Sequence, residues 1–202
     1  MSRSRTAADG SRRAFTLIEL LVVISIIAVI MGLAFPAFQG VQNSAKRTQT
    51  KNDLVQIVTA VNAFYTEYGR YPTAATTDTA AVVGGTGSTS RPLFDELRGV
   101  PTATLNTRQI VFISPPDAKD QVNAKSGIKT SDGKWYDPWG TPYVVALDAD
   151  YDNEVSNPYS SNAGAAPRLR NGVIAWSLGK NLTGGSRDKN AGDSKDDVIS
   201  WQ

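Results

Sequence analysis

The hydrophobic pattern first marks one long apolar run near the start of the chain. From Phe15 to Phe38 only Thr16, Glu19 and Ser25 are polar. A helix of this length spans about 36 Å, which exceeds the roughly 30 Å hydrocarbon core of a bilayer. The sequence therefore predicts a membrane-crossing helix over 15–38, preceded by a separate leader over 1–14.

Further along, the pattern becomes that of an amphipathic helix. Apolar residues recur at spacings of four, three, four and three, at Leu54, Val58, Val61, Tyr65 and Tyr68. These spacings place the side chains on one face of a helix, and we expect that face to be core. The Gly-Arg-Tyr-Pro sequence over 69–72 ends the helix. The sequence predicts one long helix whose amphipathic half covers 39–72.

The remainder, 73–202, is expected to form a globular domain. Residues 73–91 are rich in Gly, Thr and Ser and predict a surface loop, and a short helix follows at 93–98. Strand-like runs come next, at 109–114, 143–147, 173–178 and 198–201. A long helix followed by short antiparallel strands predicts an α+β fold, with the sheet packed on the amphipathic half of the helix.

The composition excludes several classes of function. The chain has no cysteine and no histidine, which excludes disulfides, Cys/His zinc sites, thiol nucleophiles and Ser-His-Asp triads. The formal net charge is +2, of which the first 14 residues carry +3 and the rest −1. No basic run exceeds two residues, so we expect no nucleic-acid partner. We also expect no enzymatic activity.

Two residues are unusual inside an apolar span. A carboxylate such as Glu19 costs up to a few kcal/mol in a membrane and normally has a partner there. A cut before Phe15 would create an amino group four residues from Glu19, in its own or a neighbouring subunit. Pro36 offers no N–H to the carbonyl of Gly32, so we expect the helix to kink or loosen between these two residues.

The leader and the start of the apolar run form a recognisable motif. Arg12 and Arg13 directly precede the run, which favours a cytoplasmic N-terminus. Arg-Arg-Ala-Phe-Thr-Leu-Ile-Glu over 12–19 resembles the class III leader of type IV pilins and type II secretion pseudopilins. The resemblance implies that prepilin peptidase cuts between Ala14 and Phe15 and that the Phe15 amine is methylated. It also implies assembly roles for Glu19, Gly32 and Pro36. Ala14 stands where the family normally has Gly.

A second motif narrows the resemblance to one subgroup. Tyr-Asp-Pro-Trp-Gly-Thr-Pro-Tyr over 136–143, the helix stop over 68–72 and a Ser-x-Gly loop at 177–179 are similar to general secretion pathway protein G, the major pseudopilin. Residues 73–135 diverge. The resemblance implies a subunit held in the bacterial inner membrane, with a periplasmic domain, which an assembly platform builds into a periplasmic helical fibre with minor pseudopilins. That fibre drives protein export across the outer membrane.

The resemblance also implies a structural calcium ion in the C-terminal loop. Its ligands would be the Leu178 carbonyl, Asn181, the Thr183 carbonyl and Asp196, with Ser194 or Asp197 beside it. Asn181 stands where the family commonly has Asp, which removes one negative charge from the site. An ion would also offset the ordering entropy of this glycine-rich loop, whose register over 184–193 is open.

A second candidate calcium site begins like an EF-hand loop, with Asp148, Asp150 and Asp152 at alternate positions. It lacks the glycine expected at its sixth place and the glutamate expected at its twelfth. No helix pattern flanks it. We interpret this segment mainly as an acidic turn after a strand.

Three other functions stay open at this point. One is a type IV pilus subunit for adhesion, twitching or DNA uptake, although such pilins more often have a disulfide in the C-terminal loop. Another is a minor pseudopilin, which also fits Glu19. The third is a membrane-anchored periplasmic hydrolase that uses carboxylates, but the sequence contains no acid pair in an apolar context.

Overall fold

The computed structural model describes residues 15–78, 91–160, 166–182, 188, 190 and 192–201. The side chains of 33–37, 91, 92 and 193 also lie outside this description. The chain divides into two compact units, 1–43 and 44–202, which are treated separately below. The leader over 1–14, including Ala14, lies outside the described residues.

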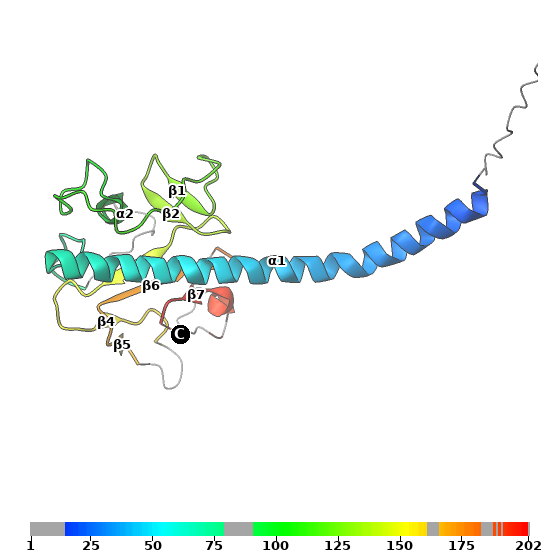
Figure 1. The fold of residues 1–202 in the computed structure, drawn as a ribbon. Helices are drawn as coiled ribbons and strands as arrows, with labels where there is room; N and C mark the ends of the chain where they lie inside the picture. The colour runs from blue at the N-terminus through cyan, green and yellow to red at the C-terminus, as the bar shows by residue number, and fades with distance from the viewer. Residues whose placement is uncertain are drawn as a thin grey trace, which may run out of the picture. The chain divides into compact units, whose positions relative to one another are not determined.

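The predicted long helix is confirmed as α1, Leu17–Tyr68, which has 52 residues (Figure 1). Its backbone stays α-helical through Gly32 and Pro36, so the expected loosening does not interrupt the helix. Gly69 ends it in the left-handed region, at φ 66°, and its N–H donates to the Tyr65 carbonyl at 2.8 Å. This glycine stop matches the end expected from the sequence.

In the first unit the apolar side chains of α1 have no cover. The large hydrophobic residues between Leu17 and Met31 are all 46% to 88% exposed. In the described part of the chain, no helix has an apolar stretch long enough to count as a candidate membrane span. The span that the sequence predicts at 15–38 is therefore not confirmed.

In the second unit α1 forms one wall of the main core. Leu54, Ile57, Val61 and Phe64 are fully buried, with Ala60 between them. Tyr65, which the sequence pattern assigned to this face, is instead 39% exposed. Ile57 and Phe64, which are not among the five residues of the predicted stripe, are buried beside Leu54 and Val61, which are. The predicted face is therefore confirmed in part, with Tyr65 as its exception.

Three antiparallel strands form the central sheet, in the order β3-β6-β7. They are β3 (Val144–Leu147), β6 (Val173–Ser177) and β7 (Val198–Ile199), close to three of the four predicted runs. Val145 of β3 pairs with Ala175 of β6, and Trp176 of β6 pairs with Ile199 of β7. Every residue of β3 and β6 is buried, so both faces of the sheet are covered.

The two faces of the sheet belong to different cores. Val145, Leu147, Val173 and Ala175 join the α1 core, and the alternate residues join a second cluster. That second cluster contains Val144, Ala146, Val155, Tyr159, Ile174, Trp176 and Ile199. Val155 belongs to β4 (Val155–Ser156), which pairs with β5 (Arg168–Leu169).

The remaining elements are short and were only partly predicted. Helix α2 (Arg91–Arg98) ends at Gly99, φ 63°, as expected from the sequence. The hairpin of β1 (Gly127–Lys129) and β2 (Lys134–Tyr136) was not predicted. A 3-10 turn, η1 (Gly192–Asp196), precedes β7. In Figure 1, α2 and the β1–β2 hairpin lie on one side of the second half of α1, and β4 and β5 lie on the other.

The predicted strand at 109–114 is wrong, because this segment is an irregular loop. Its backbone does not pair with another strand. Instead the N–H groups of Phe112 and Ile113 both donate to the carbonyl of Leu97, at 2.9 and 3.2 Å. Asn106 holds the other end of the segment by accepting from the Ile110 N–H at 3.0 Å. Side-chain and helix-end bonds thus take the place of a sheet ladder.

The buried carboxylate of Glu96 organises this loop. It accepts hydrogen bonds from the backbone N–H groups of Thr104, Leu105 and Asn106 at 2.6 to 2.9 Å, and from the Thr104 hydroxyl at 3.2 Å. Asn106 in turn accepts from the Tyr68 hydroxyl at 2.6 Å, which ties the loop to the end of α1. The sequence pattern predicts Glu96 only as part of the short helix at 93–98, and it does not indicate this network.

Candidate functional site

The carboxylate of Glu19 has a partner within its own turn of helix. Thr16 donates to Glu19 Oε2 from its backbone N–H at 2.9 Å and from its hydroxyl at 2.8 Å. The Glu19 N–H donates back to Thr16 Oγ1 at 3.3 Å. This reciprocal pair is a capping box at the start of α1. The sequence contains the signal for this cap, Thr-x-x-Glu before an apolar run, although the prediction for Glu19 did not include it.

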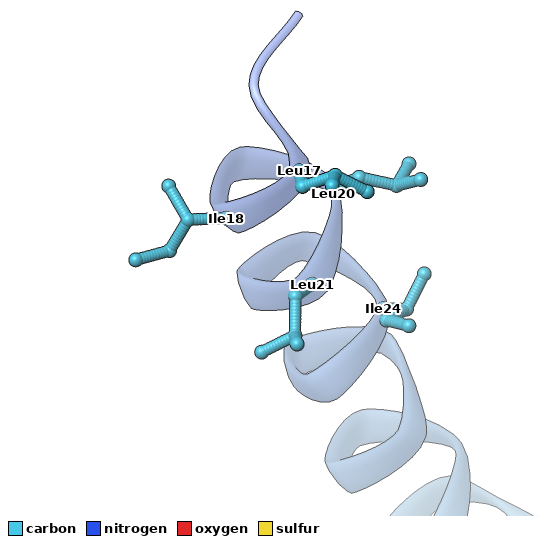
Figure 2. A pocket seen from close by; sticks show the side chains of 5 residues that line it. All are labelled: Leu17, Ile18, Leu20, Leu21 and Ile24. Atoms are coloured by element: carbon cyan, nitrogen blue, oxygen red, sulfur yellow. The ribbon is translucent and has the colours of Figure 1, made fainter.

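The first turns of α1 present an apolar surface. Figure 2 shows five side chains projecting from the helix with a shallow hollow between them: Leu17, Ile18, Leu20, Leu21 and Ile24. Phe15, the residue after the expected cut, lies just outside the helix and is 79% exposed. The capped carboxylate of Glu19 therefore sits among apolar side chains that have no cover in this unit.

In the second unit, Asp137 is the centre of the Asp-Pro-Trp-Gly turn. Its Oδ1 accepts from the backbone N–H groups of Trp139, Gly140 and Thr141 at 2.7 to 3.0 Å. Its Oδ2 accepts from the Thr141 hydroxyl at 2.7 Å and from the Ser177 hydroxyl at 2.6 Å. Asp137 is fully buried, so these five donors satisfy a carboxylate that would otherwise be costly.

The bond from Ser177 connects this turn to the C-terminal loop. Ser177 Oγ also accepts from the Gly179 N–H at 3.1 Å, so one hydroxyl joins the turn, the end of β6 and the loop. Gly179 has φ 67°, and a Cβ there would lie 2.5 Å from the Asp196 carbonyl oxygen. Asp196 Oδ2 accepts from the Asn181 N–H at 2.8 Å. The structure thus places the backbone of Asn181 and of Gly179, the residue after Leu178, beside Asp196.

The other expected ligands of this loop are placed differently. Thr183 lies outside the described residues. Ser194 and Asp197 are both fully buried. Asp197 Oδ2 accepts from the Tyr159 hydroxyl at 2.7 Å, which connects the end of the chain to the second core. Burial, together with Asp197, raises the pKa of Tyr159.

The second candidate cation site gathers a fourth carboxylate from elsewhere in the chain. Asp148, Asp150 and Asp152 are joined by Asp78, and one carboxylate oxygen from each lies within 4.8 Å of the others. Asp148 is buried, and its two oxygens accept from the N–H groups of Asp152 and Asn153, at 3.1 and 2.9 Å. Burial raises the pKa of Asp148, and the Asp78 carboxylate adds to the rise.

An arginine already neutralises part of this acidic cluster. Arg168 of β5 donates to Asp78 at 3.0 Å, to Asp152 at 2.7 Å and to Glu154 at 2.9 Å. Asp78 also accepts from the Ala149 N–H at 2.9 Å. These bonds connect Asp78 to the loop after β3 and to β5. The chemistry of the donors suits a hard cation, and the guanidinium of Arg168 supplies a cation of the protein's own.

The comparisons with known proteins each match a part of the chain. Residues 10–35 match the family model for the prokaryotic N-terminal methylation motif. The type IV major pilin protein PilA of Myxococcus xanthus is 39% identical over 59 residues, which is 29% of this chain and 27% of that protein. The type II secretion system core protein G of Klebsiella michiganensis is 35% identical over 63 residues, 31% of this chain and 44% of that protein.

A third relative extends further. Fimbrial protein Q of Moraxella bovis is 36% identical over 86 residues, 41% of this chain and 54% of that protein. The chain thus spans about a quarter to a half of the length of these relatives. No solved structure matches it significantly. The similarity lies with pilins and with core protein G, which agrees with the resemblance found in the leader and first helix.

Proposed function

We propose that this chain, which carries the N-terminal methylation motif of pilin-like proteins, is a structural subunit of a type II secretion pseudopilus. The motif over 10–35 carries the proposal. It includes the junction between Ala14 and Phe15, where a prepilin peptidase would cut and the new amine would be methylated. The repeated similarity to core protein G, in Klebsiella michiganensis and in Escherichia coli, favours secretion over the other pilin functions.

The exposed apolar part of α1 supports assembly. The side chains over Leu17–Met31 are uncovered within their own unit, so lipid before assembly and neighbouring helices after it would cover them. We place the subunit in the inner membrane before assembly, with its second unit in the periplasm. The chain is then a fibre component and not an enzyme.

Glu19 would set the register between subunits. In the single chain its carboxylate is bonded to Thr16. In the fibre the methylated amine of a neighbouring Phe15 would replace the Thr16 donors with a charged one, which is the stronger partner in an apolar medium. Before that amine replaces the Thr16 donors, Thr16 keeps the Glu19 carboxylate hydrogen-bonded.

The processing step is tested by the intact mass of the protein extracted from membranes of its native host. We expect a mass that lacks residues 1–14 and carries one added methyl group. The variant Ala14→Gly restores the residue normal for the family and should be cut at least as completely. A full-length mass for both proteins would overturn the proposal, because Glu19 would then have no amine partner.

The choice between secretion and a surface pilus is tested by deleting the gene. Loss of exported proteins from the medium, restored by the wild-type gene, supports the secretion fibre. Loss of surface fibres, twitching or DNA uptake, with secretion unchanged, would assign the chain to a type IV pilus. Complementation with Glu19→Ala should fail in either case, although the second unit still folds.

We also propose a structural calcium ion in the C-terminal loop, with the Leu178 carbonyl, Asn181 and Asp196 among its ligands. The hydrogen bond from the Asn181 N–H to the Asp196 carboxylate supports this proposal, because it holds two segments of the loop close together. The test is a melting curve of the full chain with calcium and with a chelator. We expect the chelator to lower the Tm of the wild type but not of Asp196→Asn. Asp150→Asn, in the acidic cluster, is the matched control and should keep the shift. If the chelator does not shift the Tm of the wild type, the calcium proposal is wrong.

A further inference from the structure

Asp53 places a carboxylate on the buried side of α1, outside every site described so far. Its side chain is 8% exposed. Its Oδ2 accepts a hydrogen bond of 2.7 Å from the hydroxyl of Tyr143, which is itself fully buried. Tyr143 directly precedes β3 and follows the Asp137 turn. The bond therefore connects the helix to the segment that carries this turn.

The groups around Asp53 give it little support in the ionised form. Among the described residues, no ion pair includes Asp53. Across from the helix it faces the Tyr143 hydroxyl and, at longer range, the carboxylate of Asp137. On its own helix, Lys51 directs its Nζ to the Ile199 carbonyl at 2.7 Å. A buried carboxylate is thus left facing a phenol and a like charge.

The hydrogen bonds of three buried carboxylates show the difference. Glu96 accepts four hydrogen bonds and Asp137 accepts five, whereas Asp53 accepts the one from Tyr143. Thr50, one turn earlier on the same helix, is also fully buried. Because an ionised carboxylate can accept about four hydrogen bonds, Asp53 is much less stabilised as an anion than Glu96 and Asp137.

We propose that Asp53 and Tyr143 form a proton-linked clasp between α1 and the Asp137 turn. As the pH falls, the Asp53 carboxylate takes up a proton from water, and the buried contact with Tyr143 loses its negative charge. The folded chain that contains this contact is then more stable, because the carboxyl no longer carries a buried charge. Since Asp137 also binds Ser177, the effect extends to the start of the C-terminal loop.

The sign of the effect follows from the surroundings. Burial raises the pKa of Asp53; the hydrogen bond from Tyr143 opposes the rise, and the charge of Asp137 adds to it. The folded chain therefore binds this proton more tightly than the unfolded chain, and stability rises as the pH falls through the folded pKa. The gain is complete below the unfolded value of about 3.9. A surface carboxylate that is stabilised as an anion behaves in the opposite way.

The test is the Tm of the full chain in detergent micelles, measured from pH 7.5 down to about pH 4, near the unfolded pKa, for the wild type and for Asp53→Asn. The difference between them, wild type minus variant, should rise as the pH falls, because only the wild type gains the proton. Asp120→Asn is the control. Asp120 is exposed, and hydrogen bonds from the Asn123 and Val122 N–H groups hold its pKa below the ordinary value, so its difference should not rise as the pH falls.

A constant difference for Asp53→Asn would overturn the clasp. If that variant does not fold, an NMR titration of the Asp53 carboxyl in the wild type decides the question. A midpoint above the ordinary value supports the clasp, and one at or below it overturns the clasp. In Tyr143→Phe the midpoint should move higher still, because the bond that favours the anion is lost. Both readouts concern only the second unit, so they stand or fall separately from fibre assembly.

Discussion

The two parts of α1 are the same kind of helix in very different surroundings. Between Leu17 and Met31 every large apolar side chain is at least 46% exposed. Between Leu54 and Phe64 the apolar side chains that face the sheet are buried in one core with residues of β3, β6 and β7. Helix propensity cannot hold either part alone, since most helical stability in proteins comes from packing.

The comparison distinguishes the part of α1 whose apolar side chains are covered by the chain's own domain from the part whose apolar side chains are not. The second part is stabilised by its own domain, so its sequence is constrained by folding. The first part contributes no residue to that core, and on the proposed function its apolar side chains serve contacts with lipid and with neighbouring subunits. Mutations in the two parts should therefore fail in different assays: unfolding for the second part, assembly for the first.

The largest effect is expected from Phe64→Ala. Phe64 is fully buried, and its ring centroid lies 4.6 Å from that of Tyr68 and 5.3 Å from that of Phe112. Its truncation should cost about 3–5 kcal/mol of the free energy of unfolding. Urea unfolding followed by tryptophan fluorescence measures it, because all four tryptophans lie in the second unit. The matched change Ile24→Ala should alter that free energy by less than about 0.5 kcal/mol and impair fibre assembly instead. Equal losses of unfolding free energy in Phe64→Ala and Ile24→Ala would contradict the difference between the two parts of α1.

The next effect concerns the loop that holds the end of α1. Glu96→Gln keeps the shape of the side chain but removes the charge that four donors share, and should cost about 2–3 kcal/mol. Glu67→Gln is the control, since Glu67 pairs with Arg108 at the surface and should cost below about 1 kcal/mol. Similar values for both variants in urea unfolding would contradict the role given to Glu96.

A third change tests close packing beside the helix end. A Cβ at Gly172 would lie 1.9 Å from the hydroxyl oxygen of Tyr71, so Gly172→Ala should cost about 1–3 kcal/mol. Adding Tyr71→Phe should restore part of the loss, because it removes the clashing oxygen; a double-mutant cycle measures the coupling. Gly40→Ala, where the helix has open space, should cost nothing. If the losses in Gly172→Ala and Tyr71→Phe simply add, the Tyr71 hydroxyl is not the group that the new Cβ meets.

The smallest effect is expected in the first part of the helix. Thr16→Ala opens the capping box and should cost about 1 kcal/mol locally. Unfolding of the second unit should not register it, whereas amide exchange over 17–20 in micelles should become faster. Ser25→Ala removes a hydroxyl that bonds only the Val22 carbonyl within the helix, and should leave that exchange unchanged. Unchanged exchange in Thr16→Ala would mean that the cap does not hold the helix start.

The sequence predicted the elements whose signals are local. The Gly69 and Gly99 stops, the long helix and the runs that became β3, β6 and β7 all follow from periodicity and turn residues. The pilin-like N-terminus was also correctly recognised. These features depend on residues within a few positions of one another, and one sequence is enough to read them.

What the sequence could not supply are pairings between distant residues. Residues 109–114 have a strand pattern, yet Leu97 and Asn106 hold them as a loop. Asp78 joins the acidic segment that begins at Asp148 from 70 residues away. Asp197, expected among the calcium ligands, also binds Tyr159 in a core that the β4 segment completes. Only the fold brings these residues together.

The capping box fixes more than the hydrogen bonds of Glu19. Because Thr16 takes the position just before the helix, α1 cannot wind back through Phe15, which stays in non-helical backbone and is highly exposed. Exposed, irregular backbone is what proteases attack most readily. On the proposed processing, the same two side chains that bond the Glu19 carboxylate would also leave Phe15 in a form that a peptidase can reach, and they set the residue at which the helix starts.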